Sequence, residues 1–83
     1  MSKNKITVLL VEDEQTLAMI IKDTLEENDF IIHTASDGEE GLSLFFELHP
    51  DVLVADVMMP KMDGFEMVRR IRQTDKQTPV SVS

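Results

Sequence analysis

The stretch DVLVADVMMPKMDG, residues 51–64, places one carboxylate inside an apolar run. Residues 52–55 are typical of a short buried strand, and Asp56 follows them directly, before three more apolar residues. A carboxylate buried without a partner is costly, so it usually shifts its pKa or finds a cation. We therefore expect Asp56 to have a function and look for its partners elsewhere in the chain.

Three further runs have the composition of strands, and amphipathic segments separate them. The runs are ITVLLV at 6–11, FIIHTA at 30–35 and TPVSVS at 78–83. The segments between the runs repeat apolar side chains at helical spacing. The resulting order, β-α-β-α-β-α-β, predicts one α/β domain over residues 1–83, built on a parallel sheet.

Local signals predict where the helices begin and end. Asp13 is a candidate N-cap of the first helix, and Asn28 is its predicted end. Asp37 and Asp63 are each followed three residues later by a glutamate, which is a capping-box pattern, and Pro50 is expected to stop the second helix. The apolar face predicted for the first helix consists of Leu17, Ile20, Ile21, Thr24 and Leu25.

Composition excludes several classes of function. The 83-residue chain has a net charge of −8, which argues against nucleic acid or an anionic membrane as a direct partner. It has no cysteine, so disulfide scaffolds and thiolate metal sites are excluded. The apolar run at 6–11 is too short for a signal peptide or a membrane span, and we expect a cytoplasmic protein.

Three acidic residues follow strands at the edge where such sheets bind ligands. Glu12 and Asp13 come after the first strand and Asp56 after the third. If those strands are neighbours, the three carboxylates converge, and a hard divalent cation, best Mg²⁺, would relieve their repulsion. Two alternatives stay open from spacing alone: Asp13 as a helix cap only, and Glu12 as a solvated surface residue.

Other reactive residue types point to ordinary structural roles. His33 and His49 lack a nearby cysteine or histidine partner, so we expect a strand histidine and a helix-end histidine rather than zinc ligands. The sequence has no nucleotide-binding glycine loop and no nucleophile elbow. Loop packing is expected for Met58, Met59 and Met62, and solvated faces for Lys61, Arg69, Arg70 and Arg72.

With these features in place, the chain resembles the receiver domain of bacterial two-component response regulators. The matching motifs are VLLVEDE (8–14), ASDGEEGL (35–42), HPDVLVADVMMPKMDGFEMVRRIR (49–72) and TPV (78–80). The resemblance implies a flavodoxin-like (CheY-like) fold with strand order 2-1-3-4-5. It also implies a non-enzymatic phosphoacceptor, with Asp56 taking a phosphoryl group from a histidine kinase or a small phosphodonor.

The same resemblance implies a set of metal ligands. Mg²⁺ would be held by Asp13, Asp56 and the backbone carbonyl of Met58, with Glu12 acting through water. Aspartate carboxylates of ordinary pKa, ~3.9, are ionised at neutral pH, so such an acceptor needs no general base. Catalysis would then consist of positioning and charge neutralisation.

The sequence also departs from the family pattern. The fourth helix, the fifth strand with its lysine and the fifth helix are absent, and the family's switch hydroxyl would lie one position after Ser83. In the family the first and fifth helices cover one face of the sheet. We therefore expect that face and strand four to be exposed, and the chain either to form a homo-oligomer through them or to be marginally stable.

Three functions follow from these observations. The first is a phosphoacceptor signalling domain, and the second is a phosphorylation-incompetent fragment that acts as an interaction or self-assembly module. The third is a Mg²⁺-dependent phosphohydrolase with an aspartyl nucleophile. Such enzymes commonly carry a second Asp two residues after the nucleophile, and Met58 at that position argues against this third function.

Overall fold

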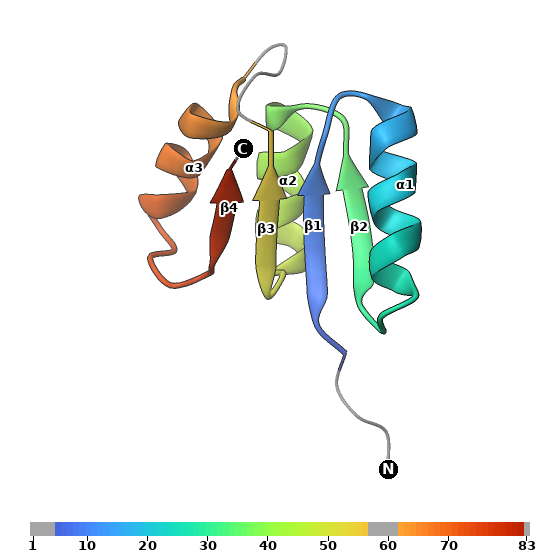
Figure 1. The fold of residues 1–83 in the computed structure, drawn as a ribbon. Helices are drawn as coiled ribbons and strands as arrows, with labels where there is room; N and C mark the ends of the chain where they lie inside the picture. Colours follow the sequence, from blue (N-terminus) through green and yellow to red (C-terminus); the bar gives the residue numbers. More distant parts are fainter. Residues whose placement is uncertain (1–4, 57–61, 83) are drawn as a thin grey trace.

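A computed structural model describes residues 5–56 and 62–82. Strands and helices alternate along the described chain, as Figure 1 shows. They are β1 (Thr7–Val11), α1 (Gln15–Glu26), β2 (Ile31–Ala35), α2 (Gly38–Leu48), β3 (Val52–Ala55), α3 (Gly64–Arg72) and β4 (Val80–Val82). The sheet is parallel with strand order β2-β1-β3-β4, which confirms the predicted fold class.

The register of the two central strands brings distant parts of the sequence together. Val11 is paired with Ala55 across the β1–β3 ladder, and with Ala35 across the β1–β2 ladder. The residues that follow these strand ends continue the pairing, because the Asp56 amide donates to the carbonyl of Val11 at 3.2 Å. The carboxyl ends of β1 and β3 therefore lie side by side, which is the condition for a site shared by the acidic residues that follow them.

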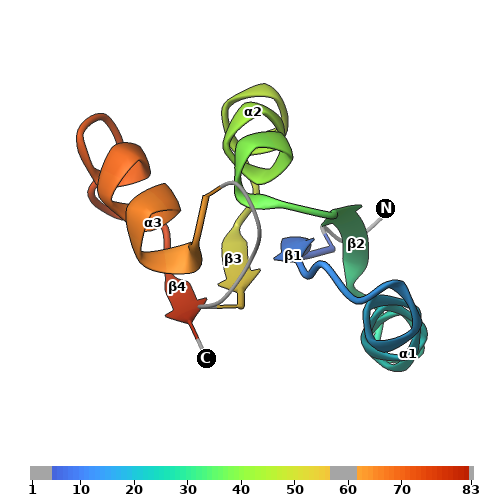
Figure 2. The same cartoon turned by 90° about the horizontal axis from the view of Figure 1, so that it is seen from above.

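The two faces of the sheet carry different numbers of helices. Seen from above in Figure 2, α2 and α3 lie on one face and α1 lies on the other, beside β2. The buried residues on the α2–α3 face are Leu9, Val11, Ala35, Phe45, Leu53, Ala55, Met62, Met67 and Ile71. The buried residues on the α1 face are Val8, Leu10, Ala18 and Ile32.

The predicted caps of α2 and α3 are confirmed. The Asp37 carboxylate accepts a hydrogen bond from the Glu40 amide at 2.9 Å, and Asp63 accepts one from the Glu66 amide at 2.8 Å. The Glu40 carboxylate also accepts from the amide and hydroxyl of Ser36, at 2.8 and 2.9 Å.

The prediction that Asp13 caps α1 is wrong. The N-cap is Glu14, in an extended conformation and without a side-chain capping bond. The helix also ends at Glu26, before the predicted Asn28, whose side-chain amide donates to the Thr24 carbonyl at 2.9 Å. Asp13 is thus left to interact with other groups at the end of β1.

The predicted apolar face of α1 is only partly buried. Ala18 is buried and Ile21 packs against the core, whereas Leu17 and Ile20 are 40% and 57% exposed. Thr24, assigned to the same face, is exposed and donates its hydroxyl to the Ile20 carbonyl. Because α1 lies beside β2, only one side of the helix meets the sheet. The predicted apolar face is wider than this contact, so some of its side chains stay exposed.

The remaining helix ends follow simple rules. His49 closes α2 in the left-handed conformation, directly before Pro50, as predicted for a helix stop.

The prediction of a solvated face is wrong for Arg72. This residue is partly buried and donates to the carbonyls of Asp75 and Thr78 at 3.2 and 2.7 Å. Within residues 5–56 and 62–82, no helix is long and apolar enough to cross a membrane.

Candidate functional site

The three predicted carboxylates meet at the carboxyl edge of the sheet. One carboxylate oxygen from each of Glu12, Asp13 and Asp56 lies within 4.8 Å of the others. Glu12 and Asp56 are half-buried and Asp13 is exposed, so the cluster opens to solvent on one side. The backbone fixes this arrangement, because the Glu12 amide donates to the Ala35 carbonyl at 3.0 Å and Asp56 is tied to Val11.

Burial, and to a lesser extent the neighbouring carboxylates, disfavour the ionised form of Glu12. Burial raises the pKa of the Glu12 carboxyl above its ordinary value, and the neighbouring charges of Asp56 and Asp13 raise it further. The hydrogen bond donated by the Glu14 amide, at 3.3 Å, works in the opposite direction. A cluster that destabilises its own negative charge in this way is suited to hold a cation.

The donor set fits a hard divalent cation. Mg²⁺ takes oxygen ligands at about 2.0–2.1 Å in an octahedron and retains several waters, so two or three carboxylates that share one solvated edge are sufficient. Asp13 makes no N-cap bond to α1, which leaves its carboxylate available for this role. The Met58 carbonyl, the third predicted protein ligand, lies outside the described residues, as do Met59 and Lys61.

The other candidate residues have the structural positions that were predicted for them. His33 lies within β2 and His49 at the end of α2. Met62 is only 7% exposed and belongs to the core cluster of the α2–α3 face, which confirms loop packing for this methionine. None of these three belongs to the acidic cluster found among the described residues.

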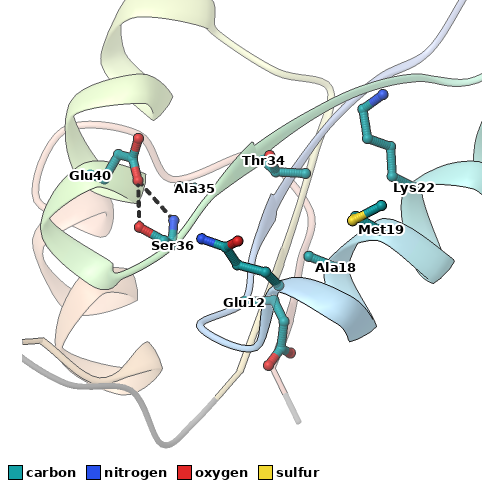
Figure 3. A pocket seen from close by; sticks show the side chains of 9 residues that line it. Glu12, Ala18, Met19, Lys22, Thr34, Ala35, Ser36 and Glu40 are labelled. Carbon is teal, nitrogen blue, oxygen red and sulfur yellow. Dashed lines mark hydrogen bonds between the residues drawn. The ribbon is translucent and has the colours of Figure 1, made fainter.

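A cavity of about 320 Å³ lies on the other side of Glu12, between α1, the end of β2 and the start of α2. Figure 3 shows its lining, with Lys22 and Met19 on α1 and the hydrogen-bonded pair Ser36 and Glu40 beside α2. The Glu12 carboxylate points away from Thr34 and Lys22 in this view. Glu12 thus lines the cavity and also belongs to the acidic cluster.

Sequence reasoning did not identify one close contact beside the site. A Cβ atom on Gly38, at the start of α2, would clash with the carbonyl oxygen of Met62 and lie 2.7 Å from its Cβ. Gly38 and Met62 are 24 positions apart, and only the fold brings them together. Gly38 directly follows the predicted cap Asp37 in the sequence, and no local pattern there signals a contact with Met62.

Comparisons with known proteins agree with this fold. The family model described as "Response regulator receiver domain" matches residues 8–83. The transcriptional regulatory protein TrcR of Mycobacterium tuberculosis is 43% identical over 74 residues, which are 89% of this chain and 29% of that protein. The chain thus spans about a third of the length of the curated relatives that it matches.

Solved structures give the same result. The receiver domain of the Francisella response regulator 1452 superposes with a TM-score of 0.90 at 36% identity, covering 94% of this chain and 64% of that one. The response regulator TrrA of Thermotoga maritima, solved in complex with Mg²⁺-BeF, superposes with a TM-score of 0.84 at 32% identity, covering 93% and 65%. Both likenesses extend over nearly all of the present chain.

Proposed function

We propose that Asp56 is the phosphoacceptor of this chain, because the chain belongs to the family of response regulator receiver domains. Accepting a phosphoryl group is the general function of such domains in two-component signal transduction. The observation that carries the assignment is the convergence of Glu12, Asp13 and Asp56 at the end of β3. Asp56 directly follows β3, which is one of the two central strands of the sheet.

The proposed step is a transfer between two nucleophiles. An oxygen of the Asp56 carboxylate attacks the phosphorus atom, the bond from phosphorus to the imidazole nitrogen of a phosphohistidine breaks, and an acyl phosphate forms while the imidazole leaves with the electron pair. With a small phosphodonor, the bond to its leaving group breaks instead. Both reactants are anionic, so the barrier is one of charge and position rather than of proton removal.

We propose Mg²⁺ as the cofactor, held by Asp13, Asp56 and the backbone carbonyl of Met58, with Glu12 acting through water. Bound Mg²⁺ would neutralise charge on the transferring group. The oxygen-only donor set supports this choice over a soft metal. That TrrA was solved with Mg²⁺-BeF supports it further by analogy.

The proposed partner is a histidine kinase, not a nucleic acid or a membrane. The net charge of −8 would repel phosphate backbones and anionic lipids. The proposal treats the domain as a phosphoacceptor rather than an enzyme with its own small-molecule product, and keeps the cytoplasm as its compartment. These assignments concern this domain, not the longer proteins that it resembles.

Labelling by a small phosphodonor tests the proposal. Intact-mass spectrometry should show the addition of one phosphoryl group in Mg²⁺ and none in EDTA. Asp56→Ala should abolish labelling. Asp51→Ala is the matched control, because Asp51 lies at the opposite end of β3, where its carboxylate accepts from the Thr7 amide at 2.8 Å. Equal labelling of the Asp56 variant, or none in the wild type, would reject the assignment.

A second candidate function is self-assembly without phosphorylation. The observation that favours it is the incompletely covered apolar surface on the α1 side of the sheet. On this side Leu17 and Ile20 of α1 are exposed, and Val52 and Val54 of β3 are only half-buried. A twofold pairing would place this surface against itself in a second copy, which is how isologous dimers form. Sedimentation should then show a dimer that dissociates in Leu17→Lys/Ile20→Lys, whereas a monomeric wild type at micromolar concentration would reject it.

A further inference from the structure

A second cavity lies at the end of the sheet opposite the acidic cluster, where β3 and β4 begin (Figure 1). Its volume is about 430 Å³, which is in the range of small-molecule sites. Two segments far apart in the sequence line it. The end of α2 contributes Phe45, Phe46 and His49, and the loop after α3 contributes residues 74–77.

The end of α2 leaves a backbone acceptor beside this cavity. The last amide that continues the helical pattern is that of His49, which donates to the Phe45 carbonyl at 2.9 Å. The Phe46 carbonyl would accept from the amide of residue 50, but Pro50 has no N–H group. The helix thus ends with the negative end of its dipole and with a carbonyl that lacks its helical donor.

The two helices that border the cavity differ in how their C-terminal ends are compensated. The last turn of α3 contains Arg69, Arg70 and Arg72, and the Lys76 ammonium donates to the Arg72 carbonyl at 2.8 Å. The last turn of α2 contains no basic residue. A cation that enters the cavity would do for α2 what Lys76 does for α3.

An aromatic surface forms one wall of the cavity. The rings of Phe45 and Phe46 lie 5.4 Å apart at an angle of 89°. Phe45 is only 1% exposed and anchors the pair in the core, whereas Phe46 is 38% exposed. The ring of Phe46 can therefore contact a bound molecule, and the face of such a ring attracts cations.

The facing loop supplies an ionised carboxylate. Asp75 accepts from the amides of Gln77 and Thr78 at 2.9 and 3.2 Å, and from the Thr78 hydroxyl at 2.5 Å. These bonds, that of the hydroxyl most of all, keep the pKa of Asp75 below its ordinary value. They fix the carboxylate in place and use three of its roughly four acceptor positions, which leaves room for a further donor.

We propose that this cavity binds a small organic ammonium ion with an apolar body. The ammonium group donates to the Phe46 carbonyl and the Asp75 carboxylate, while the apolar body lies against the ring of Phe46. The net charge of −8 favours a cation over an anion, and the size of the cavity suits a small molecule. No lining residue belongs to the acidic cluster, so the inference is independent of the proposed function.

Titration with phenethylamine, followed by amide NMR shifts, tests the proposal. This amine is a protonated ammonium at neutral pH, and it should shift the amides of residues 45–49 and 74–77. Phenethyl alcohol has the same body without the charge. It should bind about tenfold more weakly, because hydrogen bonds that involve a charged group are the stronger ones.

Three variants at exposed positions separate a specific site from general attraction to an acidic protein. Phe46→Leu removes the ring but keeps an apolar side chain, and should weaken amine binding about threefold. Glu47→Lys places a cation in the last turn of α2 and should weaken binding about threefold or more. Glu27→Lys is the matched control, because it makes the same charge change at the C-cap of α1, on the other face of the sheet (Figure 2). It should leave the affinity close to that of the wild type.

Each outcome decides for or against the site. Shifts confined to the two lining segments, with weaker binding in Phe46→Leu and Glu47→Lys only, support it. Equal affinities for the amine and the alcohol, or no shifts in the wild type at millimolar amine, overturn it. Equal losses in Glu47→Lys and Glu27→Lys, or shifts centred on the acidic cluster, also overturn it, since they reveal attraction to charge alone.

Discussion

The two faces of the sheet differ in how completely they are covered. On one face, α2 and α3 lie over a core that includes Phe45, Met67 and Ile71 (Figure 2). On the other face α1 alone contributes, with Ala18 as its single buried residue, and apolar side chains such as Leu17 and Ile20 remain exposed. The two faces therefore differ because of the helices that cover them and not because of the strands, since β1 supplies buried residues to both faces.

The difference bears on the candidate site, because each face supports a different part of it. Gly38 and Met62 are in close contact on the fully covered face. Glu12 and Asp13 lead into α1 on the sparsely covered face. We expect the Asp56 side of the cluster to be the more rigid one, and the following four predictions test the contrast between the faces.

Adjacent leucines of β1 give the most direct test. Leu9 points to the α2–α3 core and Leu10 to the α1 core, and both are almost fully buried. Leu9→Ala should lower the free energy of unfolding by about 4–5 kcal/mol, and Leu10→Ala by about 2–3 kcal/mol, because a sparsely covered site can collapse around the cavity. Urea unfolding followed by circular dichroism measures both, and equal losses would contradict the proposed contrast.

Helix capping differs between the faces as well. Asp37 caps α2 with its side chain, so Asp37→Ala should cost about 1 kcal/mol of stability. Asp37→Asn keeps a capping oxygen and should lie close to the wild type. Equal melting temperatures for the alanine and asparagine variants would show that the capping bond contributes little.

On the α1 face the corresponding cap is missing and can be added. Glu14 has the extended conformation of an N-cap but makes no side-chain capping bond. Glu14→Ser should therefore stabilise the fold by about 0.5–1 kcal/mol relative to Glu14→Ala, a difference measurable by urea unfolding. A serine variant no more stable than the alanine variant would mean that the start of α1 is frayed.

The smallest expected effect concerns the outer surface of α3. The guanidinium groups of Arg69 and Arg70 hydrogen-bond the Glu66 carboxylate and lower its pKa to about 2, from an ordinary value of 4.5. Because the folded pKa is the lower one, the stabilisation is present above pH 4.5 and is lost as pH falls toward 2. It is modest, since the pair is solvated.

Melting temperatures of the wild type and Glu66→Gln test this dependence. The wild type should be slightly more stable at pH 7, and the gap should narrow steadily between pH 4.5 and pH 3. A gap of constant size over that range would show that Glu66 acts through packing rather than through its charge.

Much of the architecture could be predicted because it depends on local patterns. Alternating apolar runs and amphipathic segments gave the order of the elements, and the aspartates at 37 and 63 gave two helix starts that the structure confirms. The same reasoning failed at Asp13. Spacing shows that an aspartate can cap a helix, but not at which residue the helix begins, and α1 begins at Gln15 with Glu14 as its N-cap.

The burial of helix faces was predicted less well. The stripe through Leu17 and Ile20 has helical spacing, yet it lies outside the contact between α1 and the sheet. In α3, likewise, the apolar side chain of Phe65 is 65% exposed, while Met67 is buried. An apolar pattern states which residues gain from burial, whereas the position of the neighbouring element decides which of them achieve it.

The sequence by itself determined that Asp56 ends a buried strand and that Glu12 and Asp13 end another, because an apolar run interrupted by an acid is a local feature. Only the tertiary structure decided that β1 and β3 are neighbours, that the three carboxylates share one edge, and that Gly38 lies against Met62. Such contacts join residues more than twenty positions apart. They depend on the chain as a whole, and no local pattern specifies them.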